Sequence, residues 1–160
     1  MKSLLIIGAG EHGQVVAECA EACGYEKIDF LDDNQSDAIG KTEQLEDIAT
    51  GYDNVIVSIG NCEIRRGLIK RLQNINAPLS ALIHPRAYIS PTVTIGPGSI
   101  ILPGAVIHTN AIVGTGCIIS IGALIDHDSI VEDFSHINTG AIVGAGQRAS
   151  GKVNPGVIIK

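Results

Sequence analysis

Residues 83–148 read IHPRAY ISPTVT IGPGSI ILPGAV IHTNAI VGTGCI ISIGAL IDHDSI VEDFSH INTGAI VGAGQR, which are eleven consecutive six-residue units. The first position is Ile or Val in all eleven units. The fifth position is Ala, Ser, Cys or Val in ten of them and departs from this set only at Gln147. Self-similarity at a fixed period of six is the sequence signature of a parallel β-helix.

The repeat predicts a three-sided coil with one six-residue unit on each side. Eleven units then form nearly four coils. The first-position Ile or Val points inward and stacks on its equivalents in neighbouring coils, and the fifth position lies near a corner where only a small side chain fits. Gly and Asn supply backbone freedom in the turns. A narrow interior also explains the aromatic content, which is three Tyr, two Phe and no Trp.

Residues 1–82 have a different organisation, in which strand-like and helix-like segments alternate. Strands are expected at 3–7, 27–31 and 55–59 and helices at 11–22, 42–49 and 65–75. This order predicts a small Rossmann-like α/β domain with a parallel sheet of about four strands. The domains are therefore expected at 1–82 (α/β) and 83–148 (β-helix). The period breaks at Gln147, so an irregular tail is expected over 149–160.

Composition and charge exclude several classes of protein. The formal net charge is −6, and this surplus lies in residues 1–82, which carry 13 acidic against 7 basic residues. Without a basic patch, a nucleic-acid partner is not expected. No apolar run reaches the roughly 18 residues that span a bilayer. The start of the chain does not resemble a signal peptide, so a cytoplasmic location with four reduced cysteines is expected.

The β-helix departs from its regular pattern between residues 126 and 136, where four acidic side chains and two histidines gather. His127 occupies the third, turn position of its unit and is expected to project outward from a corner. A neutral imidazole beside a carboxylate is a ready general base near neutral pH. Thr109 and Asn110, one coil earlier, are polar side chains within possible reach. The alternative interpretation is that His127 is a solvated corner residue.

A glycine motif follows the first predicted strand. Gly8-x-Gly10-x-x-Gly13, with Asp32 about twenty residues further on, satisfies the dinucleotide fingerprint. An NAD-binding enzyme is therefore one alternative. Against it, the α/β region is half the length of a full dinucleotide domain, and no residues for hydride transfer follow. In a further alternative, these glycines only permit close packing of the strand on the helix.

The histidines do not predict a metal site. His108, His127 and His136 are separated by 19 and 9 residues, unlike the ligand spacing of zinc-dependent β-helix enzymes. No metal is therefore expected. His84, at the entry to the β-helix, is expected to have a structural role. His108 is expected either to be structural or to support a residue of the site.

The pattern from Ile119 to Gly140, with its His-Asp pair and a second His nine residues later, resembles bacterial sugar acetyltransferases of surface-glycan synthesis. These are the sialic-acid O-acetyltransferases and the UDP-4-aminosugar N-acetyltransferases of the NeuD/PglD type. The resemblance extends to the first half of the chain through Gly8-Ala-Gly-Glu-His-Gly and Phe30-Leu-Asp-Asp. It covers residues 1 to about 146.

The resemblance implies a left-handed coil, a homotrimer, and acetyl-CoA as co-substrate. The acceptor would be an amino or hydroxyl group of a nucleotide-linked or sialic-acid-like sugar. His127 would be the general base, oriented by Asp128. Residues expected to contact acetyl-CoA are His136, near the thioester, and Gly144, Ala145 and Gly146. Residues expected to bind the nucleotide-sugar are Gly8, Gly10, His12, Gly13, Asp32, Asp33, Gly60 and Asn61.

The sequence departs from that family after Val143. The relatives usually continue for several more coils, which build much of the coenzyme A groove. A chain without them is expected to bind acetyl-CoA less well, unless a neighbouring subunit compensates. The corresponding alternative function is a shortened, non-catalytic relative that binds a nucleotide-sugar or a partner enzyme.

Overall fold

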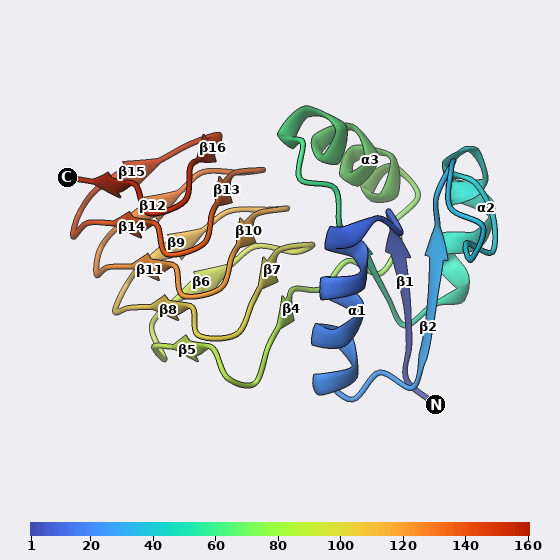
Figure 1. The fold of residues 1–160 in the computed structure, drawn as a ribbon, viewed down its shortest axis with the longest axis horizontal. Coiled ribbons are helices and arrows are strands. Elements are labelled where there is room, and N and C mark those ends of the chain that lie inside the picture. Colours follow the sequence, from blue (N-terminus) through green and yellow to red (C-terminus); the bar gives the residue numbers. More distant parts are fainter.

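The computed structural model describes residues 1–160, and it consists of an α/β domain and a β-helix that lie side by side (Figure 1). The chain passes once through the α/β domain and then winds coil by coil beside it. The last coil is at the end of the molecule that carries the C-terminus. No helix is long and apolar enough to cross a membrane.

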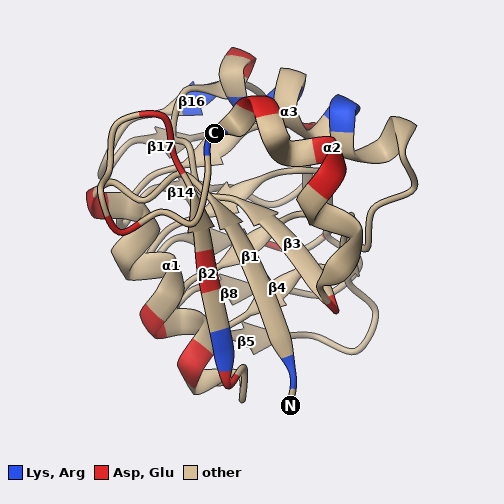
Figure 2. Ribbon diagram, turned by 90° about the vertical axis from the view of Figure 1, so that its right-hand side faces the viewer, with Lys and Arg blue, Asp and Glu red and all other residues tan.

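The α/β domain contains a parallel sheet of three strands in the order β2-β1-β3. The strands are β1 (Ser3–Ile7), β2 (Lys27–Leu31) and β3 (Asn54–Val57). The helical segments are α1 (Glu11–Ala22), η1 (Thr42–Gln44), α2 (Leu45–Ile48), η2 (Ala49–Gly51) and α3 (Cys62–Asn74). Acidic side chains mark α1, β2 and α2 (Figure 2), in agreement with the charge surplus of this half.

The sheet of the α/β domain has three strands, one fewer than the four or so that the sequence predicts. After α3 the chain runs beside the edge strand β3, where the amide of Val55 donates a hydrogen bond to the carbonyl of Pro78 at 2.8 Å. Pro78 has no N–H with which to continue a ladder. This segment therefore contributes one bond to the sheet edge and no strand.

The helix α3 begins three residues before its expected start at 65. The side-chain oxygen of Asn61 accepts a hydrogen bond from the amide of Ile64 at 3.0 Å and caps the helix. As a result, Arg65 lies in the first turn of α3, and its side chain is fully buried.

The β-helix has three faces, each a parallel sheet of two-residue strands. The first face contains β4 (Leu82–Ile83), β7 (Ile100–Ile101), β10 (Ile118–Ile119), β13 (His136–Ile137) and β16 (Lys152–Val153). The second face contains β5 (Tyr88–Ile89), β8 (Val106–Ile107), β11 (Leu124–Ile125), β14 (Ile142–Val143) and β17 (Ile158–Ile159). The third face contains β6 (Thr94–Ile95), β9 (Ile112–Val113), β12 (Ile130–Val131) and β15 (Arg148–Ala149).

The interior of the coil confirms the prediction for the repeat. First-position residues from Ile101 to Val143 are buried and stack in register, so that Ile101 pairs with Ile119 and Ile119 with Ile137. The fifth-position Ala, Ser and Cys side chains from Ser99 to Ala141 are also buried. The resulting core is aliphatic.

The expectation of an irregular tail over 149–160 is wrong. Strands β16 and β17 pair with β13 and β14 and form two sides of a further coil. The turn between β15 and β16 consists of Ser150 and Gly151 only, whereas the preceding turns contain four residues. The two-residue deletion shifts the period, and Gly151 makes the tight turn possible with a φ of +65°.

The first face packs against the α/β domain. Its sixth-position residues Leu82, Ile100 and Ile118 point outward and join one apolar cluster with Leu4 and Val16. The next outward residue on this face, one coil further, is His136, and Lys152 follows. This column of outward side chains therefore changes from apolar, where it packs on the α/β domain, to polar.

Candidate active site

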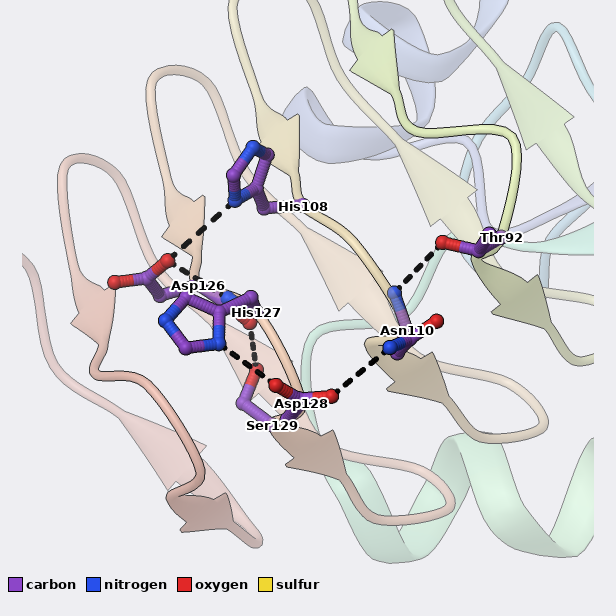
Figure 3. A network of polar contacts seen from close by, with 7 residues as sticks. All are labelled: Thr92, His108, Asn110, Asp126, His127, Asp128 and Ser129. Carbon is purple, nitrogen blue, oxygen red and sulfur yellow. Dashed lines mark hydrogen bonds and ion pairs between the residues drawn. The ribbon is translucent and has the colours of Figure 1, made fainter.

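His127 lies in the turn between β11 and β12, at the corner of the second and third faces (Figure 3). Its Nδ1 is 2.8 Å from Oδ2 of Asp128. Asp128 has a φ of +56°, and its carboxylate lies beside the preceding imidazole. Both side chains are more than half exposed, at 51% and 58%. The outward corner position expected for His127 is confirmed.

The carboxylate determines which nitrogen of His127 can accept a proton. An ionised carboxylate only accepts hydrogen bonds, so Nδ1 carries the hydrogen and Nε2 is left with its lone pair. The hydrogen bond to Asp128 raises the pKa of His127, and the charges of Asp126 and Asp128 act in the same direction. The same bond lowers the pKa of Asp128, with a further contribution from Asn110. The contact therefore fixes the imidazole with Nε2 free to accept a proton.

Two residues of the preceding coil complete the surroundings of this pair. Nδ2 of Asn110 donates to Oδ1 of Asp128 at 3.1 Å, as the spacing of one coil predicted. The ring of His108 lies edge-on to that of His127, with centroids 6.3 Å apart, and its Nδ1 is 3.7 Å from Oδ1 of Asp126. His108 therefore lies against the candidate base.

An apolar groove of about 340 Å³ adjoins the same corner. It is lined by Val106, His108, Leu124, Ile125, Asp126 and Ile142. The apolar members Val106, Leu124 and Ile142 are sixth-position residues that point outward from the second face. The pattern of first and fifth positions predicts the interior of the coil but not this groove. The sequence signal for the groove is the apolar residue at the sixth position, which faces outward.

The turn Gly144-Ala145-Gly146 lies one coil beyond His127, at the same corner. Ile125 pairs with Val143, so the three turn residues stack on Asp126, His127 and Asp128. The amide of Gly146 donates to the carbonyl of His127 at 3.0 Å. This part of the expected acetyl-CoA site is brought together with the candidate base.

His136 lies elsewhere, on the outer side of the first face. Its ring is 6.2 Å from that of His12 in α1, and its Nε2 is 3.1 Å from Oγ of Ser120. Burial lowers the pKa of His136 to about 4, with a further contribution from Arg65. Burial also lowers the pKa of His12. The buried Nδ1 of His136 and Nε2 of His12 have no hydrogen-bond partner in this chain. The structure thus groups His136 with the α/β domain and not with His127.

The glycine turn after β1 is tightly packed. Gly8 has a φ of +103°, and a Cβ on Gly13 would lie 2.2 Å from the carbonyl oxygen of Gly8. These two glycines are required by the backbone. Nothing lies within 4 Å of a Cβ placed on Gly10, so this position is open toward solvent or a ligand.

The two aspartates after β2 are engaged by main-chain groups. Oδ2 of Asp32 accepts a hydrogen bond from the amide of Ala9 at 2.8 Å, which lowers the pKa of Asp32. Its Oδ1 accepts from the amides of Asn34 and Gln35. A dinucleotide fingerprint needs this carboxylate for ribose hydroxyls. Here both oxygens already accept hydrogen bonds from main-chain amides of the glycine turn and of the loop after β2.

A polar depression of about 520 Å³ lies beside Asp32 and Asp33, between β2 and α2. Its lining runs from Asp32 to Gln44 and contains mostly charged and amide side chains. Gly60 and Asn61 follow β3 at the same end of the sheet. A Cβ on Gly60 would lie 3.9 Å from the ring of His136.

These features define a two-domain protein in which an α/β domain with a glycine turn docks on a hexapeptide-repeat β-helix that carries an exposed histidine–aspartate pair. The PglD N-terminal domain family matches residues 3–72. The acetyltransferase domain of PglB from Neisseria gonorrhoeae is 31% identical, with a TM-score of 0.90 over 100% of this chain and 92% of that chain. The same domain in complex with acetyl coenzyme A superposes with a TM-score of 0.87 over 99% and 91%.

A more distant structure is PerB from Caulobacter crescentus, solved in complex with CoA and GDP-perosamine. It is 26% identical, with a TM-score of 0.81 over 100% of this chain and 89% of that chain. The chain belongs to the PglD-type sugar acetyltransferases, which are acyltransferases with a left-handed parallel β-helix. The shares of 92% and 89% do not support the expectation that this chain lacks several coils of its relatives.

Proposed function

We propose that this protein transfers the acetyl group of acetyl-CoA to an amino or hydroxyl group of a nucleotide-linked or acidic sugar, with His127 as the general base. The observation that carries the proposal is the 2.8 Å contact between Nδ1 of His127 and Asp128 at an exposed corner beside an apolar groove. The bound ligands named for the PglB domain and for PerB support acetyl-CoA and a nucleotide-sugar as the two substrates.

The proposed reaction is a direct transfer. The acceptor nitrogen or oxygen attacks the thioester carbonyl carbon while Nε2 of His127 removes its proton. The tetrahedral intermediate then collapses, the carbon–sulfur bond breaks, and the thiolate takes up the proton from His127 as coenzyme A leaves. The raised pKa of His127 suits both steps, since the ring must accept a proton and return it.

The developing oxyanion needs a donor, and the turn one coil beyond His127 provides a candidate. The amides of Gly144 and Gly146 are already bonded, to the carbonyls of Ile159 and His127. The amide of Ala145 makes no hydrogen bond within the chain. We assign the Ala145 N–H as the group that stabilises the oxyanion.

We place the nucleotide-sugar at the carboxyl ends of β1, β2 and β3, where open α/β sheets bind ligands. The residues proposed to surround it are Gly8, Gly10, His12, Gly13, Asp32, Asp33, Gly60 and Asn61. Nε2 of His12 and Nδ1 of His136 are buried beside this region and have no hydrogen-bond partner within the chain. The carboxylates of Asp32 and Asp33 act mainly by holding the loop, because main-chain amides bond to both of them.

A homotrimer is part of this proposal. His127 and the ring pair of His12 and His136 lie on different sides of the β-helix. In this proposal, a sugar bound by the α/β domain of one protomer therefore meets the base of a neighbouring copy. The second face also needs a cover, since Tyr88, Leu124 and Ile158 expose 55%, 39% and 52% of their surfaces. A cytoplasmic location remains part of the proposal and agrees with the four free cysteines.

The test is thiol release from acetyl-CoA with a panel of nucleotide-linked 4-aminosugars and sialic acids. At least one acceptor is expected to give turnover, and His127→Asn should reduce it by about 100-fold or more. Asn keeps a donor for Asp128 and cannot accept the proton. The control is His84→Asn, because the imidazole of His84 makes a single hydrogen bond, which it accepts from the amide of Arg86 at the entry to the β-helix. Full activity of His127→Asn would refute the assigned base.

The two alternatives predict other outcomes. A non-catalytic relative would release no thiol with any acceptor but would be stabilised thermally by a nucleotide-sugar. An NAD-binding protein would be stabilised by NAD and not by nucleotide-sugars.

A further inference from the structure

Asn110 occupies a turn position that a glycine would fill without strain. It is the fourth residue of its six-residue unit and has a φ of +60°. The same position is glycine in most units, with φ between +63° and +76° at Gly98, Gly104, Gly116, Gly122, Gly140 and Gly146. Asn is among the few other residues that adopt this conformation. The backbone thus gives no reason to prefer Asn to Gly here, and the side chain must be explained by its contacts.

The side chain of Asn110 bonds to the acid of the candidate pair. Asp128 stands at the same turn position one coil further, with a φ of +56°. Its Oδ1 accepts from Nδ2 of Asn110 at 3.1 Å, and its Oδ2 accepts from Nδ1 of His127 at 2.8 Å. Two donors on two oxygens fix both the position and the plane of the carboxylate. With Asp128 58% exposed, loss of one donor would let the carboxylate rotate toward water.

Asn110 is in turn supported from the coil before it. Oγ1 of Thr92, again the fourth residue of its unit, accepts a hydrogen bond from the amide of Asn110 at 2.8 Å. Thr92, Asn110, Asp128 and His127 therefore form a continuous series of polar contacts along one corner (Figure 3). The other titratable groups that face His127 are Asp126, whose Oδ1 accepts from the amide of His127 at 2.7 Å, and His108.

We propose that Asn110 is a positioning residue: it holds the Asp128 carboxylate in the orientation that bonds Nδ1 of His127, and so keeps Nε2 as the proton-accepting nitrogen. The catalytic consequence rests on the function proposed for His127. The positioning itself does not, because it is a property of the free protein.

Asn110→Gly tests the proposal with little risk to the fold, since the turn already has a glycine conformation. Without the side-chain amide of Asn110, the Asp128 carboxylate is hydrogen-bonded to His127 for a smaller fraction of the time. The pKa of His127 should therefore fall toward its ordinary value. Proton NMR titration of the imidazole measures this shift, with the His127 signal assigned by its loss in His127→Asn. Thr92→Val should shift the pKa in the same direction by a smaller amount.

In the active enzyme, Asn110→Gly should lower kcat by about 3- to 10-fold, the equivalent of one hydrogen bond. The acidic limb of the kcat profile should move to lower pH, and KM should change little. The matched control is Asn76→Gly, because Asn76 has a φ of +52° and lies in the connection before the β-helix. This control should leave the pKa of His127 and kcat unchanged.

The outcomes separate the two proposals. An unchanged His127 titration in Asn110→Gly would overturn the positioning role, whatever the activity. If the titration shifts but no acceptor supports thiol release, the positioning role stands and the proposed function fails. A loss of activity in Asn110→Gly without any change in the titration or the pH profile would indicate a merely structural effect and would also overturn the proposal.

Discussion

Nη2 of Arg65 donates a 2.6 Å hydrogen bond to the carbonyl oxygen of Phe134, across the boundary between the two domains. Arg65 belongs to α3, and Phe134 to a turn of the β-helix. The same guanidinium bonds to the carbonyls of Gly116 and Ile59, each at 2.7 Å. Arg65 is fully buried, and no carboxylate is paired with it. Main-chain carbonyls thus solvate a buried cation, and this cation joins the β3–α3 loop to the β-helix.

Arg65→Met should therefore destabilise the whole chain. The substitution leaves the buried carbonyls of Gly116 and Phe134 without a donor, and hydrogen bonds to a charged group contribute about 1.5–3 kcal/mol each. We expect the free energy of unfolding, measured by urea denaturation, to fall by about 3 kcal/mol or more. Lys70→Met, on the exposed side of the same helix, is the control and should change it by less than about 0.5 kcal/mol. Equal stabilities of the two variants would contradict the domain-joining role.

Two glycines with the same backbone conformation should respond differently to Ala. Gly116 and Gly122 have φ of +63° and +64°, so an alanine costs about 1–2 kcal/mol at either position through backbone strain alone. At Gly122 the new Cβ meets open space. At Gly116 it would lie 2.5 Å from Ile69 and 2.8 Å from Phe134.

Thermal or urea unfolding of Gly116→Ala and Gly122→Ala checks this difference. Gly116→Ala should be the less stable variant by about 1–3 kcal/mol, the usual effect of overpacking. Because the strain is shared, the difference measures how tightly Ile69 of α3 and Phe134 of the β-helix pack around Gly116. Two variants of equal stability would mean that Ile69 and Phe134 move aside at little cost.

The sequence predicts the β-helix well because each side chain's environment repeats every coil. Ile101, Ile119 and Ile137 are eighteen residues apart and stack, so a one-dimensional pattern contains the three-dimensional contact. The pair of His127 and Asp128 was also predictable, since its two members are adjacent in the chain. The hydrogen bond from Asn110 to Asp128 is predictable for the same reason, because the two residues are 18 positions, or one coil, apart.

The other parts of the site depend on how the two domains meet, which no repeat encodes. His136 is nine residues from His127, yet it lies on another face and contacts His12 of the α/β domain. Arg65 appears in the sequence as one more charged residue of an amphipathic helix. Its partners Gly116 and Phe134 are 51 and 69 residues away, so their contacts require the folded domain interface.

The proposed homotrimer predicts that a charge on the second face will separate the copies. Leu124 lies in the middle of that face, between Val106 and Ile142. Light scattering should give about three times the chain mass of 16.7 kDa for the wild type and the single-chain mass for Leu124→Glu. Ile64→Glu is the matched control, because Ile64 is 53% exposed on α3 and should leave the mass unchanged. A wild-type chain that stays monomeric would refute the assembly.

His136 should make the stability of the protein fall in mild acid. Its pKa is about 4 in the native state, against an ordinary value of 6.5, because burial and the charges of Arg65, His12 and Lys152 disfavour the imidazolium. Above pH 6.5 both states are neutral, and His136 adds no pH dependence. Between 6.5 and 4 the unfolded chain binds a proton that the native chain does not, so the free energy of unfolding decreases as the pH is lowered.

Comparison of the wild type with His136→Gln isolates this contribution. Gln can keep a hydrogen bond to Ser120 but does not titrate, so the variant should lose less stability than the wild type between about pH 7 and about pH 5. Urea denaturation at the two pH values measures both losses. His12, whose pKa is also lowered, remains in both proteins and leaves a residual slope of the same sign. Equal losses in the two proteins would mean that His136 protonates as readily in the folded chain as in the unfolded one, despite its burial between the domains.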